Sequence, residues 1–327
     1  MHIELLEMLR CPTTGQRLAL QNPVYRDGQV YSALLVSEDG QNNYEIQDFI
    51  PRFVPKSNYA DNFGMQWNKF RQTQLDSYTG HPISSDRFWK ATGWEPEIIA
   101  DKWVLDVGCG AGRFAEVALQ AGAKVVALDF SGAVDACFAN LKHHPNLHVV
   151  QGDIYALPFL NACFPFVYSL GVLQHTPDVA KAFAALPLMV TEGGQLCTDF
   201  YWKRFQTMLH AKYLLRPITK RLPQKKLFGF LEQSVPMLLK TSQLLGRISF
   251  VGRYLKRIVP VADYTGIYPL DECQLQEWAL LDTFDMLGPQ YDSPQTAVTI
   301  NKWMSSAGFN RIEVFQANLL VVRGRKP

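Results

Sequence analysis

A glycine-rich segment that follows a short apolar run constrains this chain more than any other feature. Residues 104–107 read Val-Leu-Asp-Val, which predicts a buried strand, and residues 113–120 have the apolar spacing of a helix. Three glycines lie between them at alternate positions: Gly108, Gly110 and Gly112. Glycine permits a sharp turn at positive φ and lets a ligand approach main-chain N–H groups without a Cβ in the way. The segment therefore predicts a strand, a tight loop and a helix that bind a nucleotide-like ligand.

Two acidic residues are expected at the same edge of the sheet as this loop. Asp106 is at the carboxyl end of the first strand, where open α/β sheets bind their ligands, and an acid there favours a positively charged ligand. Asp129 follows a second apolar run, 124–128, and an acid at this position is placed to bind both hydroxyls of a ribose. We expect Phe130 to cover one face of an adenine and Ser131 to cap the next helix.

Four parts of the sequence between residues 100 and 200 together resemble the class I S-adenosylmethionine-dependent methyltransferases. They are 104–114, Asp129, 152–159 and 166–175, in the order and at the intervals usual in that family. The resemblance implies an α/β fold, namely a Rossmann-like, seven-stranded, mostly parallel sheet with an antiparallel last strand. It also implies S-adenosyl-L-methionine as the cofactor. Alternating strand-like and helical runs support a parallel sheet with right-handed crossovers.

The resemblance also gives cofactor-binding roles to single residues. Asp129 would bind the ribose, and the glycine loop would hold the methionine end. Asp153 would accept a hydrogen bond from the adenine amino group and Ile154 would pack on the ring, although an Asp in such a loop can also cap a turn. Leu170 and the residues that follow it, as far as Gln174, would line the methionine end.

The competing interpretation of the glycine segment is a nicotinamide dehydrogenase. Its fingerprint is G-x-G-x-x-G, with a small third residue that lets the helix pack closely on the strand. Here Arg113 occupies that third position, and the last glycine comes one residue early. A predicted hairpin of two strands, 311–315 and 319–322, also resembles the end of the methyltransferase sheet and is missing from the dehydrogenase half-fold. The sequence therefore favours the methyltransferase.

His175 is the candidate catalytic residue. It follows the fourth predicted strand, at the mouth of the expected site, and a histidine near its ordinary pKa can remove a proton from a substrate hydroxyl. A histidine in this loop can equally be a structural hydrogen-bonding residue. Because the sulfonium is already activated, positioning alone can supply most of the rate of an in-line methyl transfer.

Candidate substrate-binding residues lie on both sides of the nucleotide half. A predicted helix near residue 65 carries aromatic residues on one face, at positions 63, 67 and 70, and this face can simply pack on the core. The resemblance implies that such a helix closes over the cofactor, which places three side chains near the sulfonium or the substrate: Trp67, Arg71 and Tyr78. An aromatic face against a sulfonium is a cation–π contact. A predicted loop at 282–292 offers Asp285 and Tyr291, and is equally consistent with a plain surface loop.

The pattern of the chain predicts five parts. They are an N-terminal domain at 1–55, a helical lead-in at 56–100, the cofactor-binding core at 101–200, a helical insertion at 201–262 and the rest of the core at 263–327. The first part resembles short zinc-ribbon-like domains that accompany some methyltransferases, but Thr14 stands where those domains have their second cysteine. Because zinc needs about four ligands, we expect a degenerate domain without metal.

The insertion is strongly basic. Residues 201–260 contain 13 Lys or Arg and one acid, Glu232, in a chain of net charge +2. Apolar and basic residues alternate at helical spacing, with Pro217, Pro223 and Pro236 expected as breaks, which predicts a lid of three or four amphipathic helices. Three explanations of the charge remain open: a solvated face, contact with an anionic membrane surface, or an acidic substrate or nucleic acid. Nucleic acid is the least favoured, because no RNA-binding module is recognisable.

Composition limits the remaining possibilities. The chain has 327 residues, 47% hydrophobic and 19% charged, which is typical of a globular protein. Six cysteines without close pairs favour a reduced, cytoplasmic protein without disulfides, and neither a signal peptide nor an apolar run of membrane-spanning length is recognisable. Peripheral association with the inner face of the membrane stays open. The oligomeric state cannot be derived from these patterns.

These features together predict an S-adenosylmethionine-dependent methyltransferase. The expected reaction is O-methylation of a small or lipid-linked metabolite, and less readily methylation of a nitrogen or carbon. The alternative is a protein that keeps the cofactor fold without catalysis and acts as a binding protein or membrane-surface adaptor. The glycine loop and its acids argue against the alternative, although they report on cofactor binding rather than turnover.

Overall fold

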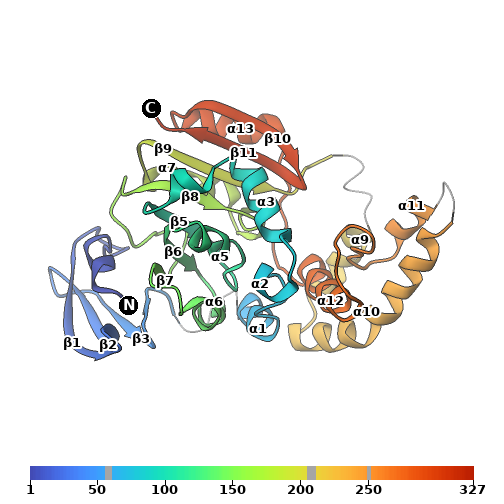
Figure 1. Ribbon diagram of the computed structural model, residues 1–327, viewed down its shortest axis with the longest axis horizontal. Coiled ribbons are helices and arrows are strands. Elements are labelled where there is room, and N and C mark those ends of the chain that lie inside the picture. Colours follow the sequence, from blue (N-terminus) through green and yellow to red (C-terminus); the bar gives the residue numbers. More distant parts are fainter. Residues whose placement is uncertain (56–60, 205–210, 249–251) are drawn as a thin grey trace.

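A seven-stranded sheet with helices on both faces forms the centre of the computed structural model, which describes residues 1–55, 61–204, 211–248 and 252–327 (Figure 1). Its strands are β5 (Trp103–Val107), β6 (Lys124–Asp129), β7 (Leu147–Gln151), β8 (Phe164–Ser169), β9 (Val190–Phe200), β10 (Asn310–Ala317) and β11 (Leu319–Arg325). They lie in the order β7-β6-β5-β8-β9-β11-β10. The first five are parallel, whereas β11 is antiparallel to both β9 and β10. The predicted Rossmann-like sheet with an antiparallel last strand is confirmed.

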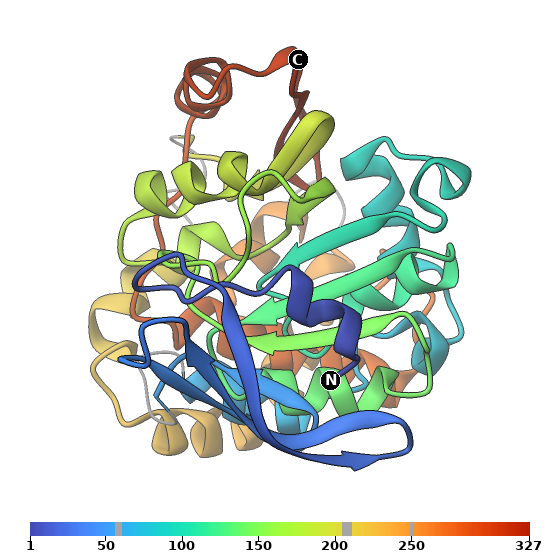
Figure 2. The ribbon, with the colours of Figure 1, turned by 90° about the vertical axis from the view of Figure 1, so that its left-hand side faces the viewer.

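Four N-terminal strands extend this sheet to eleven strands. They are β1 (Leu18–Arg26), β2 (Gln29–Ser37), β3 (Asn43–Gln47) and β4 (Ile50–Arg52), and a short 3₁₀ helix, η1 (Ile3–Glu7), precedes them. The junction is a parallel pairing of β4 with β7, where Arg52 lies opposite Gln151 and donates to its side-chain oxygen over 2.8 Å. Figure 2 shows this edge with the N-terminal strands nearest the viewer. The sequence predicted these residues as a separate unit and did not anticipate a shared sheet.

Four short helices lead into the core: α1 (Asp61–Lys69), α2 (Asp76–Thr79), α3 (Ile83–Thr92) and α4 (Pro96–Ile99). Gly64 of α1 lies so close to Gly132 that a Cβ on Gly64 would be 3.0 Å from the Gly132 nitrogen. Phe70, just after α1, is buried and contacts Phe228 of the insertion, with ring centroids 5.8 Å apart. The side chain of Phe63, expected on the same face, lies outside the described residues. The lead-in thus bridges the core and the insertion.

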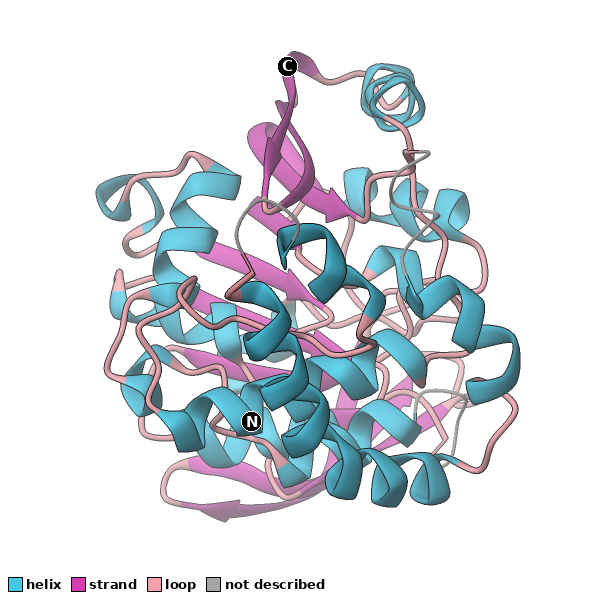
Figure 3. Ribbon diagram, turned by 90° about the vertical axis from the view of Figure 1, so that its right-hand side faces the viewer, coloured by secondary structure: helices cyan, strands magenta, loops and turns pink. Residues whose placement is uncertain are grey.

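The insertion folds into helices with a core of their own, and Figure 3 shows them in front of the sheet. They are α9 (Ala211–Thr219), α10 (Gln224–Gly246), α11 (Gly252–Leu255) and the 3₁₀ helix η3 (Lys256–Ile258). Leu231, Val235 and Leu239 of α10 pack with Leu275 of α12 (Glu272–Leu287) in this core. The expected parts at 205–210 and 249–251 lie outside the described residues.

Two of the three expected proline breaks in the insertion are wrong. Pro217 lies inside α9 and Pro236 inside α10, whereas Pro223 is the residue before α10 begins. Proline removes one helical hydrogen bond, but the buried face of α10 continues on both sides of Pro236, through Val235 and Leu239. Burial of this face outweighs the local proline penalty and keeps the helix continuous.

Helix α12 is longer than the sequence predicted. It was expected to end at Asp282, with a loop from there to residue 292, but the helix continues to Leu287. Asp285 therefore projects from a helix rather than from a loop. Only the part from Gly288 to Asp292 is irregular. No helix among the described residues is long and apolar enough to cross a membrane.

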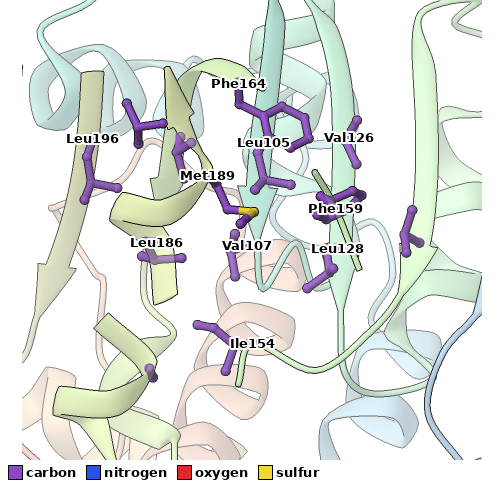
Figure 4. Close-up of a cluster of buried hydrophobic side chains, with 14 of the residues drawn as sticks. Leu105, Val107, Val126, Leu128, Ile154, Phe159, Phe164, Leu186, Met189 and Leu196 are labelled. Carbon is purple, nitrogen blue, oxygen red and sulfur yellow. The ribbon is translucent and has the colours of Figure 1, made fainter. Parts of the chain in front are cut away.

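Hydrophobic clusters cover both faces of the parallel strands. On one face, Leu105 and Val107 of β5 join Val126 and Leu128 of β6 (Figure 4). The flanking helices are α5 (Arg113–Gln120), α6 (Ala133–Leu141), α7 (Val179–Met189) and α13 (Ala297–Ser306). Because successive strand residues point to opposite faces, the other face of β5 presents Val104 and Asp106. Burial on both faces fixes the strands and so the position of the loops at their carboxyl ends.

Candidate active site

A cavity of about 1160 Å³ lies at the carboxyl edge of the parallel strands, between the core and the insertion. Its walls come from the loops after β5, β6, β7 and β8, from the lead-in, and from the insertion with α12. This is the edge at which open α/β sheets bind ligands. The volume is above the range of about 300–1,000 Å³ that is usual for a site holding one small molecule, which leaves room for a second one.

The glycine loop has the conformation that its sequence predicted. All three glycines, Gly108, Gly110 and Gly112, have positive φ. A Cβ on Gly108 would lie 2.5 Å from the methyl groups of Val172, and one on Gly110 would lie 3.2 Å from the Trp67 ring. The turn therefore requires glycine at position 108 and leaves little room for a side chain at position 110. The N–H groups of Gly108 and Cys109 both donate to the main-chain oxygen of Leu128, which fixes the loop on the end of β6.

Asp129 connects the glycine loop to the end of β6. Its Oδ2 accepts a hydrogen bond from the Gly110 N–H at 3.0 Å, and its Oδ1 accepts from the N–H and the hydroxyl of Ser131, each at 2.8 Å. Burial raises the pKa of this carboxyl, and hydrogen bonds from Ser131 and Gly110 oppose the shift. Ser131 also accepts from the Ala133 N–H at the start of α6, as a capping residue does. Asp129 lines the cavity.

The other cofactor residues expected from the sequence divide into two groups. Several line the cavity beside Asp129: Gly108, Gly110, Phe130, Ile154 and Leu170. Gly112, Asp106 and Asp153 are not among the described lining residues. Asp153 instead accepts a hydrogen bond from the Tyr155 N–H at 2.9 Å, within its own turn. This contact is the turn-capping alternative that the sequence left open.

Asp106 is buried beneath the glycine loop, with 2% of its surface exposed. Burial raises its pKa to about 8, the neighbouring Tyr168 hydroxyl partly opposes the shift, and the Asp129 charge adds to it. The group is therefore mainly a neutral carboxylic acid at pH 7. One of its oxygens, Oδ2, has no hydrogen-bond partner within the described part of the chain.

His175 lies where the core meets α12 and lines the cavity while 8% exposed. Its Nδ1 is 3.1 Å from the main-chain oxygen of Tyr291, and its Nε2 is 3.9 Å from Oδ2 of Asp285. A carbonyl oxygen can only accept, so Nδ1 carries the proton and Nε2 of the neutral ring has a lone pair. The Tyr201 ring meets the imidazole edge-on, with centroids 5.5 Å apart. These contacts fix the tautomer and the plane of the ring.

The five expected substrate residues have different positions. Trp67 and Asp285 line the cavity, whereas Arg71, Tyr78 and Tyr291 are not among its described lining residues. Tyr78 is 43% exposed and its hydroxyl lies 3.4 Å from Glu277. Tyr291 contributes its main-chain oxygen to His175 rather than its ring to the cavity.

An aromatic and charged cluster at the insertion side of the cavity was not predicted. Its main members are Gln74, Arg87, Arg113, Tyr264, Tyr268 and Asp282. Asp282 accepts hydrogen bonds from the Tyr264 hydroxyl, from the Trp278 indole N–H at 3.0 Å and from the Gln74 amide at 3.0 Å. Burial raises the pKa of Asp282 to about 6, the Tyr264 hydroxyl opposes the shift, and Asp285 adds to it.

Two arginines bring fixed positive charge to this cluster. Arg87 forms a salt bridge of 2.8 Å with Asp199, which also accepts from the Gly171 N–H. Arg113 donates to Ser84 and Gln74, and burial lowers its pKa to about 10, with the Arg87 charge adding to the effect. Arg113 was visible in the sequence only as a departure from the dehydrogenase fingerprint. The other members of the cluster carried no local signal.

S-adenosylmethionine fits the residues that surround the cavity. Gln174 is fully buried and lines the cavity, yet neither amide atom has a hydrogen-bond partner among the described residues. Such a buried amide is stable only when a ligand or water satisfies it. The Asp129 carboxylate, the glycine loop and the buried amide match a ligand with hydroxyl, carboxylate and amino groups.

The sheet order, the antiparallel last strand and the glycine loop beside Asp129 define the class I methyltransferase fold. Residues 105–198 match the family model described as a methyltransferase domain, and this part of the chain is a class I S-adenosylmethionine-dependent methyltransferase domain. S-adenosylmethionine is the cofactor of this class. The predicted family and cofactor are confirmed, and the zinc-ribbon resemblance of the N-terminal residues stays a prediction.

Curated relatives share the core but not the full length. A ubiquinone biosynthesis O-methyltransferase of Aromatoleum aromaticum is 30% identical over 38% of this chain and 55% of its own length. A tRNA U34 carboxymethyltransferase of Pseudoalteromonas translucida is 32% identical over 41% of this chain and 43% of its own. The chain thus matches about half the length of these relatives. The solved structure of a magnesium protoporphyrin IX methyltransferase of Synechocystis with bound S-adenosylhomocysteine is 15% identical, with a TM-score of 0.41 over 82% of this chain and 97% of that one.

Proposed function

We propose that this protein transfers a methyl group from S-adenosylmethionine to an oxygen atom of a small or lipid-linked metabolite. One observation carries the proposal. A single cavity is lined by the cofactor elements, Asp129 and the glycine loop, and also by His175 and an aromatic cluster suited to a second molecule. The relative named as a ubiquinone biosynthesis O-methyltransferase favours oxygen as the acceptor atom.

In the proposed complex, Asp129 accepts hydrogen bonds from the two ribose hydroxyls. A carboxylate offers about four lone-pair positions, and the bonds from Gly110 and Ser131 occupy three of them. One ribose hydroxyl takes the remaining position, and the other replaces the hydroxyl of Ser131. Phe130 and Ile154 contact the adenine, and Leu170 and Gln174 contact the methionine end. Asp153 reaches the adenine only if its turn rearranges, because its Oδ1 is bonded to the Tyr155 N–H.

His175 takes the proton of the acceptor. When bound, the cofactor supplies a methyl group on a sulfonium with a good leaving sulfur. The acceptor oxygen forms a bond to the methyl carbon, the electron pair of the broken carbon–sulfur bond stays on sulfur, and the hydroxyl proton moves to Nε2 of His175. The main-chain oxygen of Tyr291 holds the proton of the neutral ring on Nδ1, which puts the ring lone pair on Nε2, and Asp285 stabilises the resulting imidazolium.

The lining favours an apolar acceptor with a flat ring or chain and one polar end. Aromatic and apolar side chains from the lead-in and the insertion provide the wall: Trp67, Tyr201, Tyr264, Ile267, Tyr268 and Met286. Tyr264 and Tyr268 are stacked with their centroids 5.0 Å apart and together present a flat aromatic surface. The Asp282 carboxyl and the two arginines can bind a polar substituent.

Two measurements test the proposal. S-adenosylhomocysteine is titrated into the purified protein by calorimetry, and methyl-labelled S-adenosylmethionine is incubated with cell extract and the protein, followed by counting of label in the lipid and small-molecule fractions. We expect micromolar binding and transfer that His175→Ala reduces by about 10²-fold or more at unchanged binding. Binding without any transfer would favour the non-catalytic adaptor, and no binding would reject the cofactor site.

A further inference from the structure

The solvent-facing side of α10 carries a stripe of apolar side chains. Phe230 is 66% exposed, Met237 66% and Leu244 62%, and they are spaced seven residues apart. At about 100° per residue, a seven-residue spacing places successive side chains almost in line along a helix. The opposite side of α10 is the one buried against α12. The stripe is therefore not the inner face of the insertion.

A row of basic residues lies beside this stripe. Lys226, Lys240 and Arg247 are exposed, and each is three or four residues from one of the apolar side chains, which places it within about 60° of the stripe. The one acid of α10, Glu232, lies away from the row and pairs with Lys69 at 2.7 Å. The exposed face of α10 is therefore apolar and cationic at once.

Helix α9 is amphipathic in the opposite sense to an ordinary surface helix. Lys212 and Arg216 are buried and lie 2.9 Å and 3.7 Å from the Asp292 carboxylate. Leu214 and Ile218, on the other side, are 78% and 66% exposed. A surface helix normally buries its apolar side chains, so this arrangement calls for an apolar partner outside the chain.

The cavity opens on the same insertion. Tyr254 and Ile267 are exposed and line the cavity, and so does Arg204 at the start of the insertion. An apolar molecule held against the insertion would thus reach the cavity along apolar and basic side chains. The exposed residues and the opening belong to one part of the fold.

We infer that the insertion docks on an anionic lipid bilayer, with the exposed side chains of α9 and α10 in the interface and the basic row on the headgroups. The inference names the bilayer as the source of a lipid-linked acceptor, and in this respect it rests on the proposed function. Interfacial helices combine an apolar face with Lys and Arg in this way, and each basic residue adds attraction to an anionic surface.

Charge distinguishes this partner from a second copy of the chain. The exposed apolar side chains of α10 are flanked by Lys226, Lys240 and Arg247, and two such faces would repel each other. The stripe also consists mainly of aliphatic side chains, which do not stack on bases as single-stranded nucleic acid requires. An anionic bilayer satisfies both the charge and the apolar side chains.

The test is sedimentation with vesicles of pure phosphatidylcholine and vesicles containing one third phosphatidylglycerol, at low and high salt. We expect the full chain to bind the anionic vesicles, and binding to weaken with salt. Phe230→Gln with Met237→Gln, and separately Lys226→Glu with Lys240→Glu, should each reduce the partition coefficient by about tenfold or more. Two controls change exposed positions away from the insertion. Val298→Gln is the control for the apolar pair, and Lys142→Glu combined with Lys302→Glu is the control for the basic pair. Both should leave the partition coefficient within about twofold of the wild-type value.

Calorimetry with S-adenosylhomocysteine on the same variants separates the two proposals. Unchanged binding of this ligand shows that a variant is folded and that the cofactor site is intact, whatever the vesicles show. Absence of wild-type binding to anionic vesicles at low salt would overturn the docking inference. Equal losses of vesicle binding in the α10 variants and in their controls would overturn it as well. Failure to bind the cofactor product would instead count against the proposed function alone.

Discussion

The main-chain N–H of Gly110 donates a hydrogen bond to Oδ2 of Asp129 across 3.0 Å. This bond joins the loop after β5 to the end of β6, two strands that are parallel neighbours in the sheet. The carboxylate thus fixes the glycine loop and at the same time faces the cavity. The geometry of the glycine loop and this part of the cavity wall are therefore coupled through one side chain.

Asp129→Ala should weaken binding of S-adenosylhomocysteine by about 10- to 100-fold, because a charged acceptor of two hydroxyls is lost. Titration calorimetry measures the change. Asp153→Ala is the comparison, since its carboxylate is bonded within its own turn, and we expect at most a threefold effect, on the order of 0.6 kcal/mol. A similar loss in both variants would mean that Asp153 reaches the adenine, as the sequence suggested.

Gly108→Ala should lower the free energy of unfolding by about 3 kcal/mol, because an alanine at φ +86° is strained and its Cβ would lie 2.5 Å from Val172. Gly80→Ala is the matched control, at φ +72° with nothing within 4 Å of the added Cβ, and should cost about 1 kcal/mol. Urea unfolding of the two variants measures both values. Equal effects would show that Val172 moves aside without cost.

Asp106→Asn should change the pH dependence of stability. Burial raises the native-state pKa of Asp106 to about 8, so between about pH 4 and 8 the native state binds more protons than the unfolded state. The wild-type free energy of unfolding therefore carries a contribution that falls as the pH rises through this window. The asparagine variant lacks this titration. Its free energy of unfolding should therefore fall by about 2–4 kcal/mol less than that of the wild type between pH 5 and 8. If urea unfolding showed that the free energy of unfolding of the two proteins changes equally between pH 5 and 8, the assignment would be contradicted.

Metal removal should leave the N-terminal strands intact. Cys11 lies 3.3 Å from the Tyr44 hydroxyl, and the described residues contain no group of three or more His, Cys, Asp or Glu that could hold a metal ion. We expect the midpoint of thermal unfolding to be the same with and without a strong zinc chelator. A lower midpoint in the chelator would restore the zinc-ribbon interpretation.

Patterns local in sequence predicted the part of the cavity wall that the glycine loop and Asp129 form. The strand, the glycine loop and Asp129 follow one another closely, so their geometry follows from strand period and backbone freedom. Asp106 shows the limit of this reasoning. Its place at the strand end was predictable, but the face to which it points depends on the pleat, and Leu105 and Val107 occupy the face opposite to it.

The cluster at the acceptor side could not be predicted from local patterns. Gln74, Arg113, Tyr264 and Asp282 come from four separate parts of the chain, and each is an ordinary residue in its own surroundings. Only the packing of the insertion against the core brings them together. Pro236 illustrates the same point, because tertiary burial keeps α10 continuous where local propensity predicts a break.

The pairing of β9 with β11 has a consequence for how the chain folds. Leu320 lies opposite Phe200, so this pair closes a loop of roughly 120 residues. During synthesis the whole insertion, with its own hydrophobic core, leaves the ribosome before β11 does. Until then β9 is an open edge of eleven residues whose main-chain groups on that side can pair with any other strand. The nascent chain is therefore most prone to aggregate in this interval. Early folding of the insertion brings its two ends together and so shortens the distance between β9 and the arriving β11.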